Sequence, residues 1–257
     1  MIENKPFEKD LIGKKVVVCF SQGIDSTTLA YYYSYRGAEV TLAYFDDGPW
    51  NVPGDTFYDP SQPVVHNHFM SEEPDYYAKW HSDWVGMKYV KIRYPQLNAL
   101  HAVVPPDNDK AEHAEGLGLH FWVGYKPLMN MILMGYGSAH NQDLIVFGHL
   151  NEDTAYYDEN PKPFDQLRDF MVETYQRVKI PLVDNPYCRW NFNKQDVIDL
   201  AKKVGAPLSH SYSCRRTPAI RHEDGRYIQC GVCENCLRRI EAFKIHGSRD
   251  PALYDNS

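Results

Sequence analysis

The chain begins with alternating blocks of apolar and polar residues that predict strands followed by helices. Residues 15–20 form a short apolar run with three valines, which is typical of a strand buried in a parallel sheet. From Ser26 the apolar spacing becomes that of a helix, which we expect to stop at Gly37. A second apolar run, 39–45, predicts another strand. These segments predict one strand–helix–strand unit, with a right-handed crossover if its strands are parallel.

The same alternation continues along the chain, with longer polar stretches between the elements. Residues 49–74 and 101–119 show no period and are predicted to be loops. We expect further strands at 89–93 and 143–147 and helices at 75–86, 127–140, 165–177, 194–204 and through about residue 245. Strands that alternate with helices over most of a chain predict an α/β fold with a doubly wound parallel sheet.

Two parts are predicted within the chain. Residues 1–205 are expected to form a nucleotide-binding α/β domain with a loop-rich insertion at 49–120, and residues 206–257 a small C-terminal subdomain. The formal net charge of −7 argues against a protein that binds nucleic acid without sequence preference. No apolar run approaches the ~20 residues that span a bilayer, and the N-terminus lacks an apolar signal core. We therefore expect a cytoplasmic protein with no membrane partner.

Four of the six cysteines cluster near the C-terminus, with the spacing Cys-x15-Cys-x2-Cys-x2-Cys: Cys214, Cys230, Cys233 and Cys236. In a chain without an export signal, such clustering favours a metal over disulfides. A two-residue gap lets neighbouring thiolates turn onto one metal, and four sulfurs complete the tetrahedral shell of Zn²⁺ with no open position. We predict a structural zinc site, with free core cysteines or an iron–sulfur cluster as the alternatives. Cys19 and Cys188 are expected to be ordinary buried residues.

The turn between the first strand and the first helix reads "SQGIDS", residues 21–26. In a doubly wound sheet, this turn offers backbone N–H groups and the positive end of a helix dipole to an anion. Gly23 allows backbone to approach an oxygen closely, and Ser21 and Ser26 supply hydroxyl groups. The sequence contains neither the lysine-bearing P-loop nor Gly-x-Gly-x-x-Gly. By itself the turn indicates either a phosphate cradle or a plain strand-to-helix connection.

The segment "SQGIDST" resembles the Ser-Gly-Gly-x-Asp-Ser signature of the PP-loop ATP pyrophosphatases, the adenine-nucleotide alpha-hydrolase-like group. These enzymes bind the β,γ-pyrophosphate of ATP in the loop and transfer AMP to a substrate oxygen. Gln22 stands where the group has glycine, and Asp25 is expected either to position Mg²⁺ or to hold the loop. The resemblance implies that ATP contacts Ser21, Gln22, Gly23, Ile24, Asp25, Ser26, Thr27, Tyr44 and Gly148.

The tail, "YSC" followed by "CGVCENCLRRIEAF", resembles the 7-cyano-7-deazaguanine (preQ0) synthase family of this group. The resemblance implies an ATP-dependent carbon–nitrogen ligase that forms AMP and pyrophosphate. It would adenylate the carboxylate of 7-carboxy-7-deazaguanine and, with ammonia, convert it to the amide and then the nitrile. The implied cofactors are ATP, Mg²⁺ and structural Zn²⁺, and the implied partner is the deazapurine, without nucleic acid. A homodimer is one option for the assembly.

The expected catalytic residues are Asp25, Ser26, Asp153 and Lys194. The expected substrate contacts are Lys126, Asp153, Tyr157 and Arg239. Other readings are a helix N-cap for Asp153 and solvated surface charges for the two lysines. The family usually has an Arg-Asn pair at Tyr125-Lys126, and Tyr-Pro-Asp-Cys-Arg where this chain has "YDENP" at 157–161.

Because those two segments line the family's substrate pocket, the acceptor is open to alternatives. One is transfer of the activated deazapurine to a protein amine, as in relatives from defence operons. A second is a PP-loop tRNA-modifying enzyme, which the net charge of −7 disfavours. A third is a zinc module without catalytic activity that binds a nucleotide or a partner protein.

Overall fold

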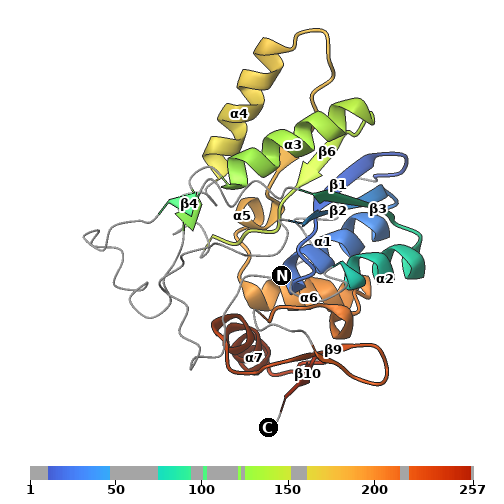
Figure 1. The fold of residues 1–257 in the computed structure, drawn as a ribbon, viewed down its shortest axis with the longest axis vertical. Coiled ribbons are helices and arrows are strands. Elements are labelled where there is room, and N and C mark those ends of the chain that lie inside the picture. Colours follow the sequence, from blue (N-terminus) through green and yellow to red (C-terminus); the bar gives the residue numbers. More distant parts are fainter. Residues whose placement is uncertain are drawn as a thin grey trace.

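A computed structural model describes residues 11–46, 75–93, 101–102, 121–122, 125–151, 161–214 and 220–255, and these parts are coloured in Figure 1. For 101–102, 121–122, 125 and 161–163 only the backbone is considered. The predicted site residues Asp153 and Tyr157 lie outside the described residues. The predicted loop at 49–74 lies outside them as well, and so does the predicted loop at 101–119 except for residues 101–102, which form a strand instead.

A five-stranded parallel sheet forms the centre of the molecule, in the order β3-β2-β1-β6-β7. Its strands are β1 (Lys15–Cys19), β2 (Glu39–Asp46), β3 (Lys88–Arg93), β6 (Leu144–Val146) and β7 (Leu182–Asp184). The chain runs outward from β1 to β3 and then returns to the other side of β1. The order therefore reverses between β1 and β6, and ligands bind at such a switch point, beyond the carboxyl ends of the strands. The predicted doubly wound sheet is confirmed.

Helices cover both faces of this sheet (Figure 1). The helices are α1 (Ile24–Tyr35), α2 (Tyr76–Val85), α3 (Tyr125–Ala139), α4 (Pro161–Thr174), α5 (Pro186–Trp190), α6 (Lys194–Val204) and α7 (Glu234–His246). α3 and α4 lie on one face, at the top of Figure 1, while α1, α2 and α6 lie on the other. Each long helix that the apolar spacing predicts is present, with bounds within a few residues of the expected ones.

The two faces of the sheet follow from the alternation of side chains along its strands. Val16 and Val18 of β1 pack with α1 and α6 in one core cluster. Val17, between them, packs with α3 and α4 in a second cluster. All three valines have no exposed surface. Because both faces are covered, the strands read as continuous apolar runs, which is why they are recognisable in the sequence.

Helix α6 has the bounds that its sequence predicts, and its ends show why. The Asn193 side chain accepts a hydrogen bond from the backbone N–H of Asp196, whose carboxylate accepts one from the N–H of Asn193. This reciprocal capping box satisfies two donors that a helix start leaves without partners. At the other end Gly205 adopts φ +69°, the left-handed conformation that ends many helices. α6 packs against α1 and α7.

The C-terminal segment adds a small sheet beside the cysteines. Its strands, in the order β10-β9-β8, are β8 (Ile220–Arg221), β9 (Tyr227–Gln229) and β10 (Leu253–Tyr254). A further pair is formed by β4 (His101–Ala102) and β5 (Phe121–Trp122), and a short 3-10 helix spans Leu208–His210. These short elements, like β7 and α5, were not predicted. The division into domains at 205/206 stays a prediction.

Among the described residues, no helix combines the length and the apolar character that crossing a membrane requires.

Candidate functional site

The Ser21–Ser26 loop connects β1 to α1 at the carboxyl edge of the sheet. Gly23 is the N-cap of α1 and provides no side-chain cap, so the first N–H groups of the helix have no capping partner there. The hydroxyl of Ser26 accepts a hydrogen bond from the N–H of Ser21 (3.2 Å) and donates one to the carbonyl of Gly23 (3.3 Å). It also lies 3.3 Å from the Ser21 hydroxyl. Ser26 thus closes the loop, while the helix N–H groups stay available to an anion.

An ion pair joins this loop to a helix far along the chain. The ammonium of Lys194, the first residue of α6, donates to both carboxylate oxygens of Asp25, at 2.8 and 2.7 Å. The two side chains keep 23% and 25% of their surface exposed. The Tyr187 hydroxyl of α5 donates to the Asp25 carbonyl at 3.0 Å. Two residues predicted to be catalytic therefore meet beside the loop, half-buried and still open to solvent.

Gly148, at the end of β6, lies directly against Asp25. A Cβ added to Gly148 would be 3.3 Å from the Cβ of Asp25 and 3.4 Å from its carbonyl carbon. These distances are shorter than most contacts of a real Cβ, so glycine suits the close approach of the end of β6 to the start of α1. Gly148 therefore lies beside the loop, and its contact with ATP stays a prediction.

The other predicted nucleotide contacts differ in their surroundings. Ile24 and Thr27 are buried, and the backbone N–H of Thr27 donates to the Gly23 carbonyl at 3.0 Å, so neither side chain is exposed to a ligand. The Tyr44 ring is 1% exposed and belongs to the core cluster on the α1 face, so its side chain does not reach the surface of the site. The expectation that Tyr44 contacts ATP is not supported by this burial.

Lys126, at the start of α3, lies on the other face of the same sheet edge. Its ammonium is close enough to influence two neighbours, Cys19 at the end of β1 and His149 after β6. Burial raises the pKa of Cys19 to about 11 against the opposing effect of the Lys126 charge, so the thiol stays protonated at neutral pH. Burial and the same charge hold the pKa of His149 well below its usual range. Lys126 therefore lies at the carboxyl edge of the sheet, and its predicted contact with substrate stays a prediction.

Two polar groups near Lys126 are buried without hydrogen-bond partners among the described residues. The amide of Asn130, on α3, has neither its oxygen nor its nitrogen paired, and Asn130 is fully buried. Nδ1 of His149 is also unpaired. Because Asn130 follows Lys126 by four residues in one helix, the two side chains share a helix face. The sequence does not predict that these two side chains are buried without partners, because a single Asn or His outside a motif carries no such information.

Arg239 is in a different environment from the one its sequence position suggests. Its side chain is 1% exposed, and its guanidinium donates to both oxygens of Asp250 at distances of 2.9 to 3.2 Å. Further donors reach the Ser211 hydroxyl (2.8 Å) and the Leu208 carbonyl (2.9 Å). These contacts tie α7 to two other segments. The guanidinium of Arg239 is thus bonded within the protein, and this geometry gives no support to the expected contact with a substrate.

The four clustered cysteines converge on one point. The sulfur atoms of Cys214, Cys230, Cys233 and Cys236 all lie within 4.8 Å of one another. The sulfurs of Cys230 and Cys236 are 3.9 Å apart, close to the ~3.8 Å edge of a tetrahedron with zinc–sulfur bonds of about 2.3 Å. Backbone N–H groups of Cys230 and Cys233 donate to sulfurs of the cluster, both at 3.3 Å. The donor set therefore suits a closed metal site.

The remaining cysteines are less buried than predicted. Cys19 and Cys188 are half-buried, whereas the sequence predicts ordinary buried residues. The thiol of Cys188 donates to the His149 carbonyl and accepts from the Asn185 amide, at 3.3 and 3.2 Å. It is therefore a local link between α5 and the end of β6.

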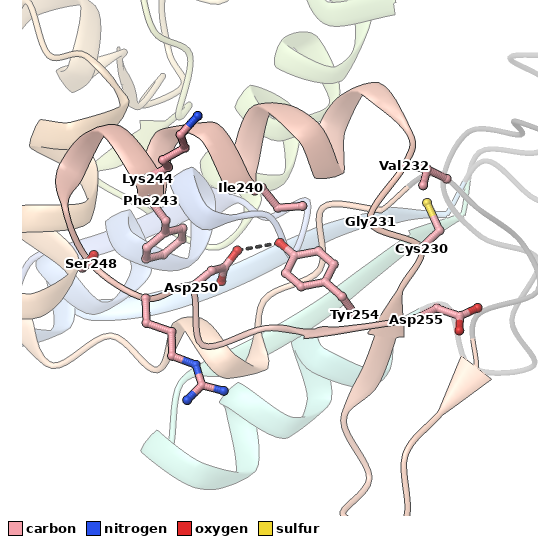
Figure 2. A pocket seen from close by; sticks show the side chains of 11 residues that line it. Cys230, Gly231, Val232, Ile240, Phe243, Lys244, Ser248, Asp250, Tyr254 and Asp255 are labelled. Atoms are coloured by element: carbon pink, nitrogen blue, oxygen red, sulfur yellow. Dashed lines mark hydrogen bonds between the residues drawn. The ribbon is translucent and has the colours of Figure 1, made fainter. Parts of the chain in front are cut away.

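A hollow of about 490 Å³ lies beside the cysteine cluster, between α7 and the C-terminal strand (Figure 2). The Tyr254 ring crosses it, and its hydroxyl donates to Asp250 at 2.5 Å. Lys244 and Arg249 also line it, whereas the loop at 21–26 does not. This hollow is thus separate from the carboxyl edge, and we do not assign it to the nucleotide.

The reversed strand order, the uncapped helix start after a Ser/Gly loop at the switch point and the C-terminal four-cysteine group are the features expected of an α/β protein of the PP-loop ATP pyrophosphatase class. Residues 98–247, more than half of the chain, match the family described as queuosine biosynthesis protein QueC. The chain belongs to this family, and the resemblance found in the sequence is confirmed.

Curated relatives match nearly the whole chain. A protein of Methanobrevibacter smithii named 7-cyano-7-deazaguanine synthase is 24% identical over 95% of this chain and 100% of its own length. One of the same name from Sulfolobus acidocaldarius is 24% identical over 99% of this chain but only 51% of its own length. The chain thus spans about half of that relative. Among solved structures, the U34-tRNA thiolase NcsA from Methanococcus maripaludis with its [4Fe-4S] cluster is 15% identical. It covers 81% of this chain and 63% of its own, with a TM-score of 0.45.

Proposed function

We propose that this protein is an AMP-forming ligase that activates the carboxylate of 7-carboxy-7-deazaguanine and converts it, with ammonia, to 7-cyano-7-deazaguanine. The family and the names of its relatives support the substrate class. The single observation that carries the chemistry is the Asp25–Lys194 pair at the uncapped start of α1. It combines a cation, a carboxylate and free helix N–H groups at the switch point of the sheet.

In the first half of the reaction, a carboxylate oxygen attacks the α-phosphorus of ATP, and the bond from that phosphorus to the pyrophosphate oxygen breaks. The departing pyrophosphate would lie in the Ser21–Ser26 loop, where the N–H groups of α1 and the Lys194 ammonium oppose its growing charge. Such groups are fixed before the reaction, so they stabilise the charge without reorganising. This role needs no covalent participation by the protein.

In the second half, ammonia attacks the acyl-adenylate and releases AMP, leaving the primary amide and a proton. A second ATP then adenylates the amide oxygen, with pyrophosphate leaving into the same loop. Loss of AMP and of the nitrogen-bound protons yields the nitrile. The same loop thus serves both activations, because each breaks the same bond of ATP.

The residues fit the two implied metals differently. Mg²⁺ would neutralise phosphate charge, and the Asp25 carboxylate, beside the Lys194 ammonium, could hold it at the loop. The four thiolates suit Zn²⁺ and would leave it no open position, so this metal would stabilise the fold. Asp153 and Tyr157 stay candidates for Mg²⁺ or the substrate on the sequence argument alone.

The activity is tested with purified protein, ATP, Mg²⁺, ammonia and 7-carboxy-7-deazaguanine. Release of pyrophosphate and AMP, with a product mass of the amide or nitrile, is expected. Omitting the carboxylate, or using Asp25→Asn protein, gives the matched blanks. A deazapurine attached to protein when ammonia is omitted would instead favour transfer to a protein amine. No carboxylate-dependent turnover of ATP would refute the ligase proposal. The expected homodimer, the cytoplasmic location and the absence of a nucleic-acid partner stay predictions.

A further inference from the structure

Gln22 occupies an unusual backbone conformation inside the pyrophosphate loop. Its φ is +65°, in the left-handed region that residues with a Cβ avoid, and only 2% of its surface is exposed. Such a conformation costs of the order of 1 kcal/mol or more and persists where the surroundings hold it in place. The positive φ also explains why glycine is expected at this position. The side chain of Gln22 must therefore make contacts that offset the strain.

Those contacts cap a helix that lies far away in the sequence. The side-chain oxygen of Gln22 accepts hydrogen bonds from the N–H groups of Tyr77 (3.0 Å) and Ala78 (3.3 Å), at the second and third positions of α2. A helix normally receives these bonds from its own N-cap residue. The N-cap residue here, Asp75, gives no such cap, because its carboxylate binds the Tyr89 hydroxyl (2.5 Å) and Lys79 (3.4 Å). Gln22 supplies the missing cap.

The backbone of Gln22 makes a second long-range tie. Its carbonyl accepts a hydrogen bond from the N–H of Tyr212 at 2.7 Å, just before the first clustered cysteine. The Tyr212 ring packs in the same cluster as Tyr77 and Tyr227, and the Tyr77 hydroxyl accepts from the N–H of Tyr227 at 2.7 Å. The loop, α2 and the cysteine-bearing segment therefore meet at one buried residue.

We propose that Gln22 is a positioning residue that holds the pyrophosphate loop in its anion-binding shape by fixing it to α2 and to the segment before Cys214. This inference rests on the proposed function, because it concerns the loop that would bind ATP. Gln22 sets the affinity for the nucleotide and takes no part in bond making. Loosening the loop weakens its hold on the phosphates of bound ATP, so the larger effect falls on the Kd and KM for ATP, and kcat changes less.

Two substitutions separate the side-chain cap from the backbone strain. Gln22→Met keeps the size and the strain but removes the acceptor, whereas Gln22→Gly relieves the strain and also removes the acceptor. Both should increase the Kd and the KM for ATP about tenfold, with kcat within about threefold, because two buried N–H groups lose their partner. Amide hydrogen exchange at Tyr77 and Ala78 should become faster in both. Gln22→Glu keeps an acceptor and should restore that protection.

Gln142→Met is the matched control. Gln142 is 5% exposed and lies just before β6, at the edge of the sheet opposite the loop, so this variant also removes a buried amide. It should leave the affinity for ATP and the protection of α2 unchanged. An equal loss of affinity in Gln142→Met would show that any buried amide has this effect, and would overturn the inference.

The remaining outcomes also decide the question. Wild-type affinity for ATP in both Gln22→Met and Gln22→Gly would overturn the positioning role, as would lost affinity with unchanged protection of α2. Binding is measured by calorimetry with ATP and Mg²⁺, which needs no acceptor substrate. A wild-type protein that binds no ATP would count against the proposed function itself, so the two failures are distinguishable.

Discussion

Replacing Arg239 with Met should destabilise the protein strongly without altering its affinity for the substrate. The side chains of Arg239 and Asp250 are 1% and 8% exposed, so the substitution leaves a buried carboxylate without its counter-charge. It also removes the donors that reach the Ser211 hydroxyl and the Leu208 carbonyl. Methionine fills most of the same volume, so the change acts mainly through charge and hydrogen bonds.

The size of the effect follows from what remains around Asp250. Removing one partner of a buried ion pair typically lowers the free energy of unfolding by roughly 3–5 kcal/mol. The Tyr254 hydroxyl and the Ala252 N–H still donate to Asp250, at 2.5 and 2.9 Å. The expected loss of unfolding free energy is therefore near the lower end of this range. A loss of about 3 kcal/mol should lower the urea midpoint by on the order of 1 M.

The assay compares urea unfolding and steady-state kinetics of the metal-loaded variants. Arg238→Met is the matched control. Arg238 directly precedes Arg239 in α7, but its side chain is 57% exposed and pairs with Glu234 on the surface. Loss of that pair should cost under about 1 kcal/mol. If Arg239→Met retained the wild-type midpoint and instead raised the KM for the deazapurine, the structural reasoning would be refuted and the sequence expectation restored.

Three further predictions concern the loop, the metal and the amino edge of the sheet. Lys194→Met should reduce kcat/KM by at least about a hundredfold, which steady-state kinetics measures. The loss of stability, measured by thermal unfolding, should be on the order of 1 kcal/mol, because the Lys194 and Asp25 side chains keep 23% and 25% of their surface exposed to solvent. Near-normal turnover would exclude Lys194 from the site. Removing the metal with a chelator should lower the melting temperature by more than about 10 °C, because metal binding to the four thiolates contributes folding free energy. Elemental analysis that finds iron instead of zinc would contradict the zinc assignment. The Lys15 N–H and the Lys179 side chain lower the pKa of Asp143, so its contribution to stability is present above the unfolded pKa of about 3.9 and is lost as pH falls through the folded pKa. Asp143→Asn should therefore be less stable than wild type near neutral pH, and the difference should vanish once the pH falls below the folded pKa of Asp143. A difference that persists in acid would contradict this.

The sequence was informative wherever an element is long or buried on both faces. The runs at 15–20 and 39–45 lie in a sheet covered on both sides, so their apolar character was continuous and visible. β7 has three residues, and Leu182 within it is 57% exposed, so no period could mark it. The short strands beside the cysteines escaped prediction for the same reason.

Residue roles were less accessible than elements, because they depend on partners that sequence spacing does not specify. Arg239 follows the last clustered cysteine closely, and the motif cannot distinguish a substrate contact from an internal bond to Asp250, which lies eleven residues further on. Tyr44 shows the same limit, since a tyrosine near a strand end can face either the core or the ligand. Lys194 was a better candidate because it begins an amphipathic helix whose buried face fixes its direction.

The Ser21–Ser26 loop illustrates why a short motif was ambiguous by itself. Its local bonds, all centred on the Ser26 hydroxyl, would suit a plain turn as well as a phosphate cradle. The contacts that distinguish the two come from elsewhere: Asp25 binds Lys194, which is 169 residues away, and Gln22 caps a helix 55 residues away. A plain turn needs none of these, whereas a loop that must keep N–H groups aimed at an anion needs its backbone held from several sides. The long-range contacts, more than the motif, therefore argue for a binding site.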